Sequence, residues 1–325
     1  MSEFLLEVQD LVTSFPGSGS ERARVVDGVS FNIRPGEVMA LVGESGCGKS
    51  VSALSLLRLV PKPGAIESGS VLLDGKDILS LSVPDMRKVR GHEMSMIFQE
   101  PMTSLNPVVR VGDQVVEAIR LHEDVSVKAA RSRTLELFKQ VRIPDPEVRL
   151  DAYPHHLSGG LKQRIMIAMA LATRPKLIIA DEPTTALDVT IQAQILSLLR
   201  QLQQELDTAV LLITHDLGVV NELADRISVM YAGRIVEQGD RREVLANPGH
   251  PYTRGLLRSM PGLGRPGEPL AEISGMVPAP ADWPRGCRFC TRCSEVLDIC
   301  ESEVPARRRL SLTHHVACHA VEATE

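Results

Sequence analysis

Short apolar runs and longer helical patterns alternate along most of the chain. The runs are rich in Val, Leu, Ile and Met, which is typical of buried strands. Residues 191–206 have the length and spacing of a helix that crosses between two parallel strands. These patterns predict an α/β fold with strands at residues 38–42, 71–73, 94–98, 177–180 and 209–213.

Two other parts of the chain have different patterns. Residues from about 100 to 160 place apolar side chains near helical spacing, which predicts a helical subdomain inserted in the α/β core. Proline and glycine are frequent over residues 261–286, where regular structure is not expected. We therefore expect one domain at residues 1–245, which includes the helical subdomain, and a C-terminal accessory region at residues 246–325.

The composition is that of an ordinary globular protein. Of the 325 residues, 43% are apolar and 24% are charged, which excludes a disordered or collagen-like chain. The formal net charge of −5 argues against a nucleic-acid-binding surface. No apolar stretch is long enough to span a membrane, and the first residues lack the basic start of a secretory signal. We expect the chain to stay in the cytosol unless a partner holds it at a membrane.

Residues 43–50 predict a phosphate-binding loop. Their sequence, Gly-Glu-Ser-Gly-Cys-Gly-Lys-Ser, fits the pattern G-x4-G-K-[ST], follows an apolar strand and precedes a helical run. Glycines let successive backbone N–H groups point at phosphate oxygens, and the helix presents its positive end. Lys49 would reach the β- and γ-phosphates of ATP, and the Ser50 hydroxyl would bind Mg²⁺. The expected ATP contacts are Gly43, Glu44, Ser45, Gly46, Cys47, Gly48, Lys49, Ser50 and Val51, with Cys47 as a small filler rather than a nucleophile.

A second, acidic element strengthens this interpretation. The apolar run at residues 177–180 is followed directly by two acidic residues, Asp181 and Glu182. Asp181 can hold Mg²⁺, and Glu182 can polarise an attacking water as a general base. The lysine loop and the acidic pair together predict an ATPase.

Residues 157–164, Leu-Ser-Gly-Gly-Leu-Lys-Gln-Arg, resemble the LSGGQ signature of ATP-binding cassette (ABC) ATPases. Leu161 stands where the signature usually has glutamine, and bulky apolar residues occur there in the peptide-importer branch. The two glycines precede an apolar helix at residues 165–172 and form a second amide-rich anion site. In this family each ATP is clamped between the lysine loop of one subunit and the signature of the other, which implies a head-to-tail dimer. The signature residues expected to contact ATP are Ser158, Gly159, Gly160 and Gln163.

The other ABC motifs follow in the family's order over about residues 4–245. Gln99 matches the Q-loop glutamine, and His215 matches the switch histidine near the γ-phosphate. Asp188 ends a sequence, Ala-Leu-Asp, that matches the D-loop, and Phe15 is placed like the aromatic residue that stacks on adenine. The resemblance implies a P-loop ABC ATPase core with the catalytic residues Lys49, Gln99, Glu182 and His215, and with Mg²⁺ bound by Ser50, Gln99 and Asp181.

Three segments narrow the resemblance to the dipeptide/oligopeptide/nickel importer family, closest to its dipeptide-transport ATPases. They are residues 98–107, 181–190 and 250–253. The resemblance implies an ATP-hydrolysing subunit, peripheral on the cytoplasmic face of the inner membrane, that powers uptake of dipeptides or oligopeptides. Its implied partners are two membrane permease subunits, a second ATPase subunit that is usually a paralogue, and a periplasmic or extracellular solute-binding protein that acts through the permeases.

Three other functions stay open. The same machinery could import nickel, glutathione or D-alanyl-D-alanine, because selectivity in this architecture lies in the binding protein and the permeases. A soluble ABC ATPase acting on nucleic acid is a rival of another class, although such chains usually carry two cassettes or a long coiled coil. A subunit with inactive ATP sites is the third, although every catalytic position is intact here.

Five of the six cysteines lie in the C-terminal region. In a reducing compartment this clustering favours a metal over disulfides. Four thiolates can hold Zn²⁺ or a [4Fe–4S] cluster; the close C-x2-C-x2-C run resembles the start of a ferredoxin motif, and the second knuckle of a zinc ribbon is missing. The matching cysteines of the importer branch resemble those of members with an iron–sulfur cluster. The ligands implied by this resemblance are Cys287, Cys293, Cys300 and Cys318, with Cys290 possible, in a structural or redox-sensing role.

Overall fold

The computed structural model describes residues 3–17, 22–100, 104–185, 187–260 and 272–322. Its contacts divide the chain into two compact units. The first unit comprises residues 1–33, 38–79 and 212–325, and the second comprises residues 34–37 and 80–211. The division of the sequence into domains at residues 1–245 and 246–325 stays a prediction.

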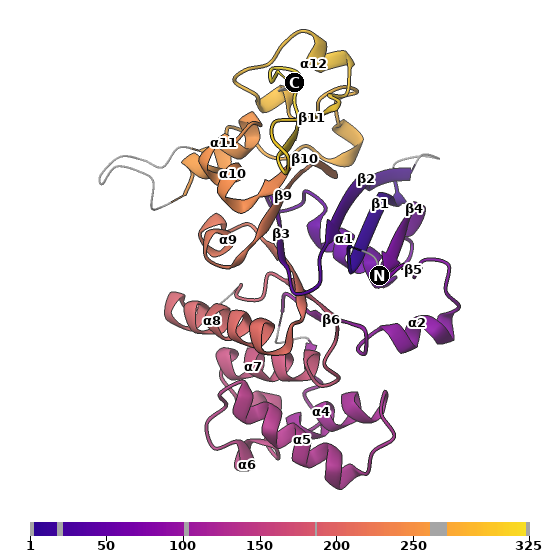
Figure 1. Ribbon diagram of the computed structural model, residues 1–325, viewed down its shortest axis with the longest axis vertical. Coiled ribbons are helices and arrows are strands. Elements are labelled where there is room, and N and C mark those ends of the chain that lie inside the picture. The colour runs from indigo at the N-terminus through magenta and orange to yellow at the C-terminus, as the bar shows by residue number, and fades with distance from the viewer. Residues whose placement is uncertain (1–2, 18–21, 101–103, 186, 261–271, 323–325) are drawn as a thin grey trace. The chain divides into compact units, whose positions relative to one another are not determined.

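The first unit contains an antiparallel sheet of four strands (Figure 1). Its order is β2-β1-β4-β5, and helix α1 (Lys49–Leu56) packs against β1 and β2. In the second half of β2, buried positions alternate with less buried ones, because only one face of such a strand meets the core. The strands are β1 (Leu6–Pro16), β2 (Arg22–Ile33), β4 (Ala65–Leu73) and β5 (Lys76–Asp77).

A second set of strands in the first unit carries its main core. The strands lie in the order β11-β12-β10-β9-β3; β3 and β9 pair in parallel, and the other neighbours are antiparallel. Every residue of β3 is buried, which explains its uninterrupted apolar sequence. The strands are β3 (Val38–Val42), β9 (Arg226–Tyr231), β10 (Arg234–Asp240), β11 (Arg307–Arg309) and β12 (His315–Ala317).

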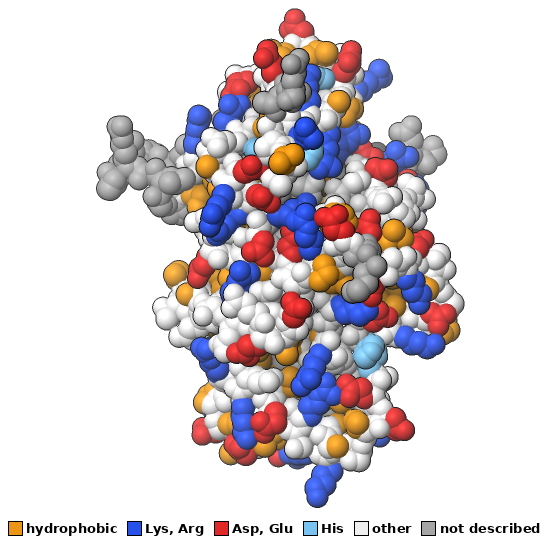
Figure 2. All heavy atoms as spheres, in the orientation of Figure 1, with side chains coloured by type: hydrophobic (Ala, Val, Ile, Leu, Met, Phe, Trp, Pro, Cys, Tyr) orange, Lys and Arg blue, Asp and Glu red, His pale blue; other side chains and the backbone are white. Residues whose placement is uncertain are grey.

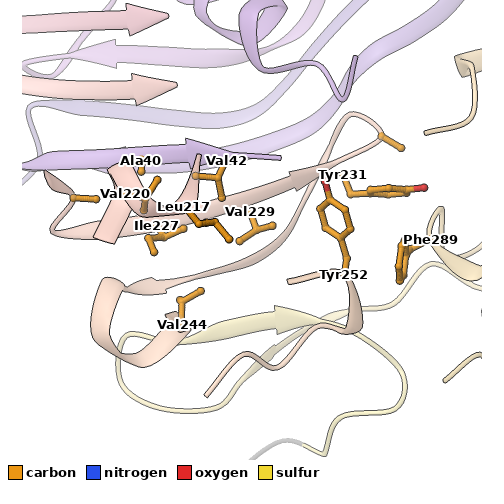
Figure 3. Packing of buried hydrophobic residues seen from close by; sticks show 12 residues of the cluster. Ala40, Val42, Leu217, Val220, Ile227, Val229, Tyr231, Val244, Tyr252 and Phe289 are labelled. Carbon is orange, nitrogen blue, oxygen red and sulfur yellow. The ribbon is translucent and has the colours of Figure 1, made fainter. Parts of the chain in front are cut away.

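Helices of the first unit pack onto this set of strands. Figure 3 shows the buried cluster that joins β3 and β9 to α9 (Leu217–Leu223), α10 (Arg241–Ala246) and α11 (Pro251–Arg258). Phe289 of the C-terminal region belongs to the same cluster. The shorter helices are η2 (Pro280–Asp282), η3 (Cys290–Arg292) and α12 (Ile299–Ser302).

Two carboxylates attach the C-terminal region to the rest of the first unit. Glu237 on β10 is buried and accepts hydrogen bonds from the Gly249 and His250 amides, and its Oε1 lies 2.6 Å from His314 Nε2. Asp27 on β2 accepts hydrogen bonds from Arg234 and Arg288. Breaking either set of contacts leaves a carboxylate without its hydrogen-bond donors, so both constrain where the C-terminal segment lies.

The second unit holds two parallel strands and a group of helices. Strand β6 (Met94–Ile97) pairs with β7 (Leu177–Asp181), and Met94 lies opposite Leu177. Helices α4, α5 and α7 contact one another, and α7 also contacts α8 (Figure 1). The helices are α2 (Val83–Val89), α4 (Val111–Arg120), α5 (Val127–Gln140), α6 (Pro146–Arg149), η1 (Pro154–His156), α7 (Gly159–Ala170) and α8 (Val189–Leu206).

The α/β fold and the helical nature of residues 100–160 are confirmed where the structure describes them. The start of the helix predicted at residues 165–172 is wrong, because α7 already begins at Gly159. Ser158 caps this helix by accepting from the Leu161 amide, so the two glycines form its first turn rather than precede it. No helix in the described part of the chain is long and apolar enough to cross a membrane.

Candidate nucleotide-binding site

The glycine-rich loop joins β3 to α1 in the first unit. Gly48, at the N-cap of α1, has a φ of 109°, a region that favours glycine. A Cβ at Gly43 would lie 2.2 Å from the Met230 carbonyl oxygen, so a larger residue does not fit there. The loop therefore has the strand–glycine loop–helix geometry of a phosphate-binding site.

Lys49 is folded back onto this loop. Its Nζ donates to the carbonyl oxygens of Gly43, at 2.8 Å, and Glu44, at 3.0 Å, and the residue is 5% exposed. The ammonium is thus already at the loop that is expected to receive the phosphates. A bound triphosphate would give it anionic oxygens in place of neutral carbonyls.

Cys47, one of the residues of this loop, is buried and is 1% exposed. Burial raises the pKa of its thiol, and the nearby Lys49 ammonium offsets this only in part. The residue is therefore an uncharged thiol near neutral pH, which fits a space-filling position.

The acidic pair lies at the end of β7 in the second unit. Asp181 is buried as the last residue of the strand, and Glu182 follows with a φ of 45°. Gln99 Nε2 donates to Glu182 Oε2 at 3.1 Å, and the Thr185 hydroxyl donates to the same oxygen at 2.8 Å. These two contacts fix the direction of the carboxylate, as a positioned general base requires. The structure thus brings Gln99 and Glu182 together.

The signature residues begin α7 in the second unit. A Cβ at Gly160 would lie 2.9 Å from Ile191 Cγ2, so the close packing of α7 on α8 favours a small residue there. Gln163 is 1% exposed, and its Nε2 makes no hydrogen bond among the described residues. Its contact with a nucleotide stays a prediction.

Three further predicted site residues lie on separate elements. Phe15 is half-buried near the end of β1, beside Gly64. His215 is exposed and follows β8 (Ala209–Thr214), in the part of the chain that belongs to the first unit. Asp188 caps α8 by accepting from the Ile191 amide at 2.9 Å; Ala186 of the same motif lies outside the described residues.

The C-terminal cysteines come from short, irregular elements of the first unit. The Cys287 amide donates to the Cys300 carbonyl at 2.8 Å. Burial, together with the neighbouring thiols of Cys300, Cys290 and Cys318, raises the pKa of Cys287 to about 11. These four thiols therefore lie near one another. Within the described ranges, however, no group of three or more His, Cys, Asp or Glu side chains is arranged to hold a metal ion.

Comparison with protein families gives two matches, which cover different parts of the chain. Residues 26–185 match the model of the ABC transporter family. Residues 236–300 match the model described as the C-terminal region of oligopeptide/dipeptide transporters.

Several curated proteins are similar to this chain over nearly its whole length. The oligopeptide transport ATP-binding protein OppD of Bacillus subtilis is 51% identical over 96% of this chain and 87% of its own length. The dipeptide transport ATP-binding protein DppD of Escherichia coli is 49% identical over 97% of this chain and 96% of its own length. This chain belongs to the ATP-binding proteins of the oligopeptide/dipeptide ABC transporter family.

A solved ABC cassette has a similar fold. The cassette MJ0796, in a dimeric post-hydrolysis state bound to ADP and phosphate, aligns with a TM-score of 0.66 at 28% identity. The alignment covers 73% of this chain and 99% of the cassette. The ABC ATPase fold is therefore confirmed for this family member, and the chain is an ATP-hydrolysing ABC subunit.

Three residues that lie at the site were not predicted from the sequence. Thr185 holds Glu182, and its place among the residues after the acidic pair is a signal that could have found it. Tyr252 and Arg292 both contact Glu44 of the loop. They come from a segment far along the chain, and nothing in the local spacing connects either to the loop.

We expect Glu182→Gln to bind ATP but to hydrolyse it very slowly. The amide can still bond Gln99 or Thr185, but it cannot accept a proton from water, which costs about 10²–10⁴ in rate. Nucleotide affinity and the single-turnover rate of ATP hydrolysis, measured on the same preparation, check this. Exposed Glu136→Gln is the matched control, and a Glu182→Gln rate like that of the control would remove Glu182 from its role.

Proposed function

We propose that ATP hydrolysis by this chain powers the uptake of dipeptides or oligopeptides through an ABC importer. The observation that carries the proposal is the likeness to peptide-transport ATP-binding proteins over both the cassette and the C-terminal region. The intact phosphate loop and the positioned carboxylate of Glu182 support an active rather than an inactive subunit.

In the proposed mechanism, ATP binds at the loop between β3 and α1. The loop amides and Lys49 bind the β- and γ-phosphates and neutralise charge that develops during transfer. Gln99 and Thr185 aim the Glu182 carboxylate at the attacking water, whose proton it accepts. His215 contacts the γ-phosphate and stabilises the transferring group.

The donor set proposed for Mg²⁺ consists of oxygen atoms. Ser50 supplies a hydroxyl, Gln99 an amide oxygen and Asp181 a carboxylate, and these hard ligands suit Mg²⁺. A Mg²⁺ held by these residues would supply positive charge that offsets the charge of the phosphates. The assignment rests on the motifs and on this chemistry.

A second ATPase subunit completes each site in the proposal. The N-terminal turn of α7, with Ser158, Gly159 and Gly160, presents amides suited to an anion, and would meet the ATP held by the partner's loop. The structurally similar cassette MJ0796 is dimeric. The partner is a second copy or, as is usual in this branch, a paralogue.

The proposed dock for the permeases lies on the helices of the second unit. A hollow of about 390 Å³ on α4 and α5 exposes Leu121 (72%) and Val127 (54%) beside Asp113 and Arg120. An exposed apolar patch with a charged rim suits a short amphipathic helix. Two membrane permease subunits, each offering such a helix, would hold the chain at the cytoplasmic face of the inner membrane. A solute-binding protein would act through them.

The transported solute is chosen outside this chain in the proposed assembly. Nickel, glutathione and D-alanyl-D-alanine stay alternatives for that reason. Nucleic acid is not a proposed partner: the net charge is −5, and basic and acidic side chains are interspersed on the face shown in Figure 2.

The proposal includes a metal group at the C-terminal cysteines. Burial and the neighbouring Cys300, Cys290 and Cys318 raise the pKa of Cys287, and burial with Cys318 and Cys300 raises the pKa of Cys293. Thiols kept protonated in this way would have to release protons to bind a cation. The arrangement described above does not itself form a metal site, so the side chains would have to rotate to bind a [4Fe–4S] cluster or, alternatively, Zn²⁺. Its role would be structural or redox-sensing.

The transport function is tested by uptake of a radiolabelled dipeptide in cells that lack the gene. Complementation with the wild-type chain should restore uptake, and Glu182→Gln should not. Labelled nickel and glutathione are tested in parallel. Uptake of nickel alone, or unchanged uptake of every solute in the deletion strain, would contradict peptide import by this chain.

A variant of the hollow proposed to bind the permeases adds a second test to the uptake experiment. Leu121→Asp places a charge in the hollow on α4 and α5, so it should lower both uptake and recovery of the chain with membranes that contain the permeases. Asp113→Asn at the rim is the control and should be recovered like the wild type. Equal recovery of both variants would exclude this hollow as the dock.

The metal proposal predicts brown protein after anaerobic purification. A [4Fe–4S] cluster should absorb broadly near 400 nm and give about four irons per chain. Cys293→Ser and Cys300→Ser should lose the colour. Colourless protein with about one zinc per chain would decide for the alternative, and metal-free protein with titratable thiols would contradict both.

A further inference from the structure

Glu44, the second residue of the phosphate loop, is held by the C-terminal region. Its amide donates to the hydroxyl oxygen of Tyr252 at 2.7 Å. Its carboxylate receives two hydrogen bonds from Arg292, at 2.7 Å and 2.9 Å. Its carbonyl accepts from Lys49. The same carbonyl also accepts from the Cys47 amide at 3.3 Å. Every polar group of this residue is therefore engaged, and two of its four partners, Tyr252 and Arg292, lie outside the sequence motif.

Tyr252 is a rigid anchor for this contact. It is fully buried on α11, and its ring packs edge-on against Tyr231 at 4.7 Å and lies 5.4 Å from Phe289 (Figure 3). Burial raises the pKa of its hydroxyl, so the group stays protonated and neutral at physiological pH. The aromatic cluster thus fixes an oxygen at one place under the loop.

Arg292 is equally constrained. Its Nε donates to the Ser274 carbonyl at 2.8 Å and its Nη2 to the Gly275 carbonyl at 3.0 Å, so the guanidinium plane is set before it reaches Glu44. Its side chain is 4% exposed. The hydrogen bonds to Glu44 raise the pKa of Arg292, so the guanidinium stays charged. A bidentate guanidinium–carboxylate contact fixes both position and orientation.

A carboxylate beside a phosphate-binding loop presents an electrostatic problem. The Glu44 charge would repel a triphosphate unless it is neutralised, and the low exposure of Arg292 limits screening by water. Neutralisation by Arg292 removes this repulsion while it holds the Glu44 backbone in place. The ion pair thus has both an electrostatic and a positional effect on the loop.

We propose that Arg292 and Tyr252 are positioning residues for ATP binding, which act through Glu44 to set the conformation and charge of the phosphate loop. The C-terminal region is thereby a working part of the nucleotide site. The proposal rests on the assignment of residues 43–50 to the phosphates.

The test is a mutant cycle on the full-length chain, with the Kd of a fluorescent ATP analogue in the presence of Mg²⁺ as the readout. Arg292→Ala should raise Kd about tenfold in the wild-type background, which is the size of coupling typical of contacting charged residues. In the Glu44→Ala background the same substitution should change Kd less than about twofold. An equal effect in both backgrounds, or no effect in either, would overturn the proposal.

Two further variants separate this effect from simple unfolding. Arg254→Ala breaks another ion pair of the C-terminal region, to Glu295, without contact to the loop, and should leave Kd unchanged. A rise like that of Arg292→Ala would make the effect a general loosening and overturn the proposal. Tyr252→Phe keeps the ring and removes the hydroxyl oxygen; it should raise Kd a few-fold while kcat at saturating ATP stays near the wild-type value. A lowered kcat with an unchanged KM would contradict a positioning role in binding.

Lys49→Ala distinguishes a failure of the phosphate-loop assignment from a failure of the role proposed for Arg292. If it abolishes binding while Arg292→Ala has no effect, the loop assignment stands and the role of Arg292 fails. If Lys49→Ala binds the analogue as the wild type does, the site assignment fails, and the proposal fails with it.

Discussion

A loop that binds phosphates through its backbone must hold several N–H groups in one direction before any ligand is present. Here that requirement is met by close packing: Gly43 lies against the Met230 carbonyl, and Gly48 begins α1 in a conformation that glycine favours. Lys49 donates to two backbone carbonyls of the loop, and the ion pair of Glu44 with Arg292 adds one ionic contact. The loop is therefore braced by β3, α1, β9 and the C-terminal region, and its chemistry depends on all of them.

The attachment of the C-terminal region also depends on specific polar contacts that are removed from water. Glu237 and Asp27 are carboxylates that receive several hydrogen bonds each, and such contacts are costly to break once they are removed from water. They place the turn that carries Arg292, between Cys290 and Cys293, against the loop. The geometry of the cysteine-rich segment and that of the nucleotide site are therefore linked through one side chain.

Much of the fold could be predicted because its signals are local. The all-buried strand Val38–Val42, the lysine loop and the acidic end of β7 each follow from a few consecutive residues. The early start of α7 could not, because its glycines are held in helix by the Ser158 cap and by packing against Ile191. Glu44 and Arg292 are 248 positions apart, and only tertiary structure brings them together.

The contacts of Tyr252 and Arg292 with Glu44 should stabilise the phosphate loop in the nucleotide-free chain. Hydrogen–deuterium exchange of residues 43–50, compared between the wild type and Arg292→Ala without nucleotide, tests this most directly. We expect faster exchange in the loop of the variant, and unchanged exchange in α4, which serves as the internal reference. Identical exchange of the loop in both proteins would contradict the claim.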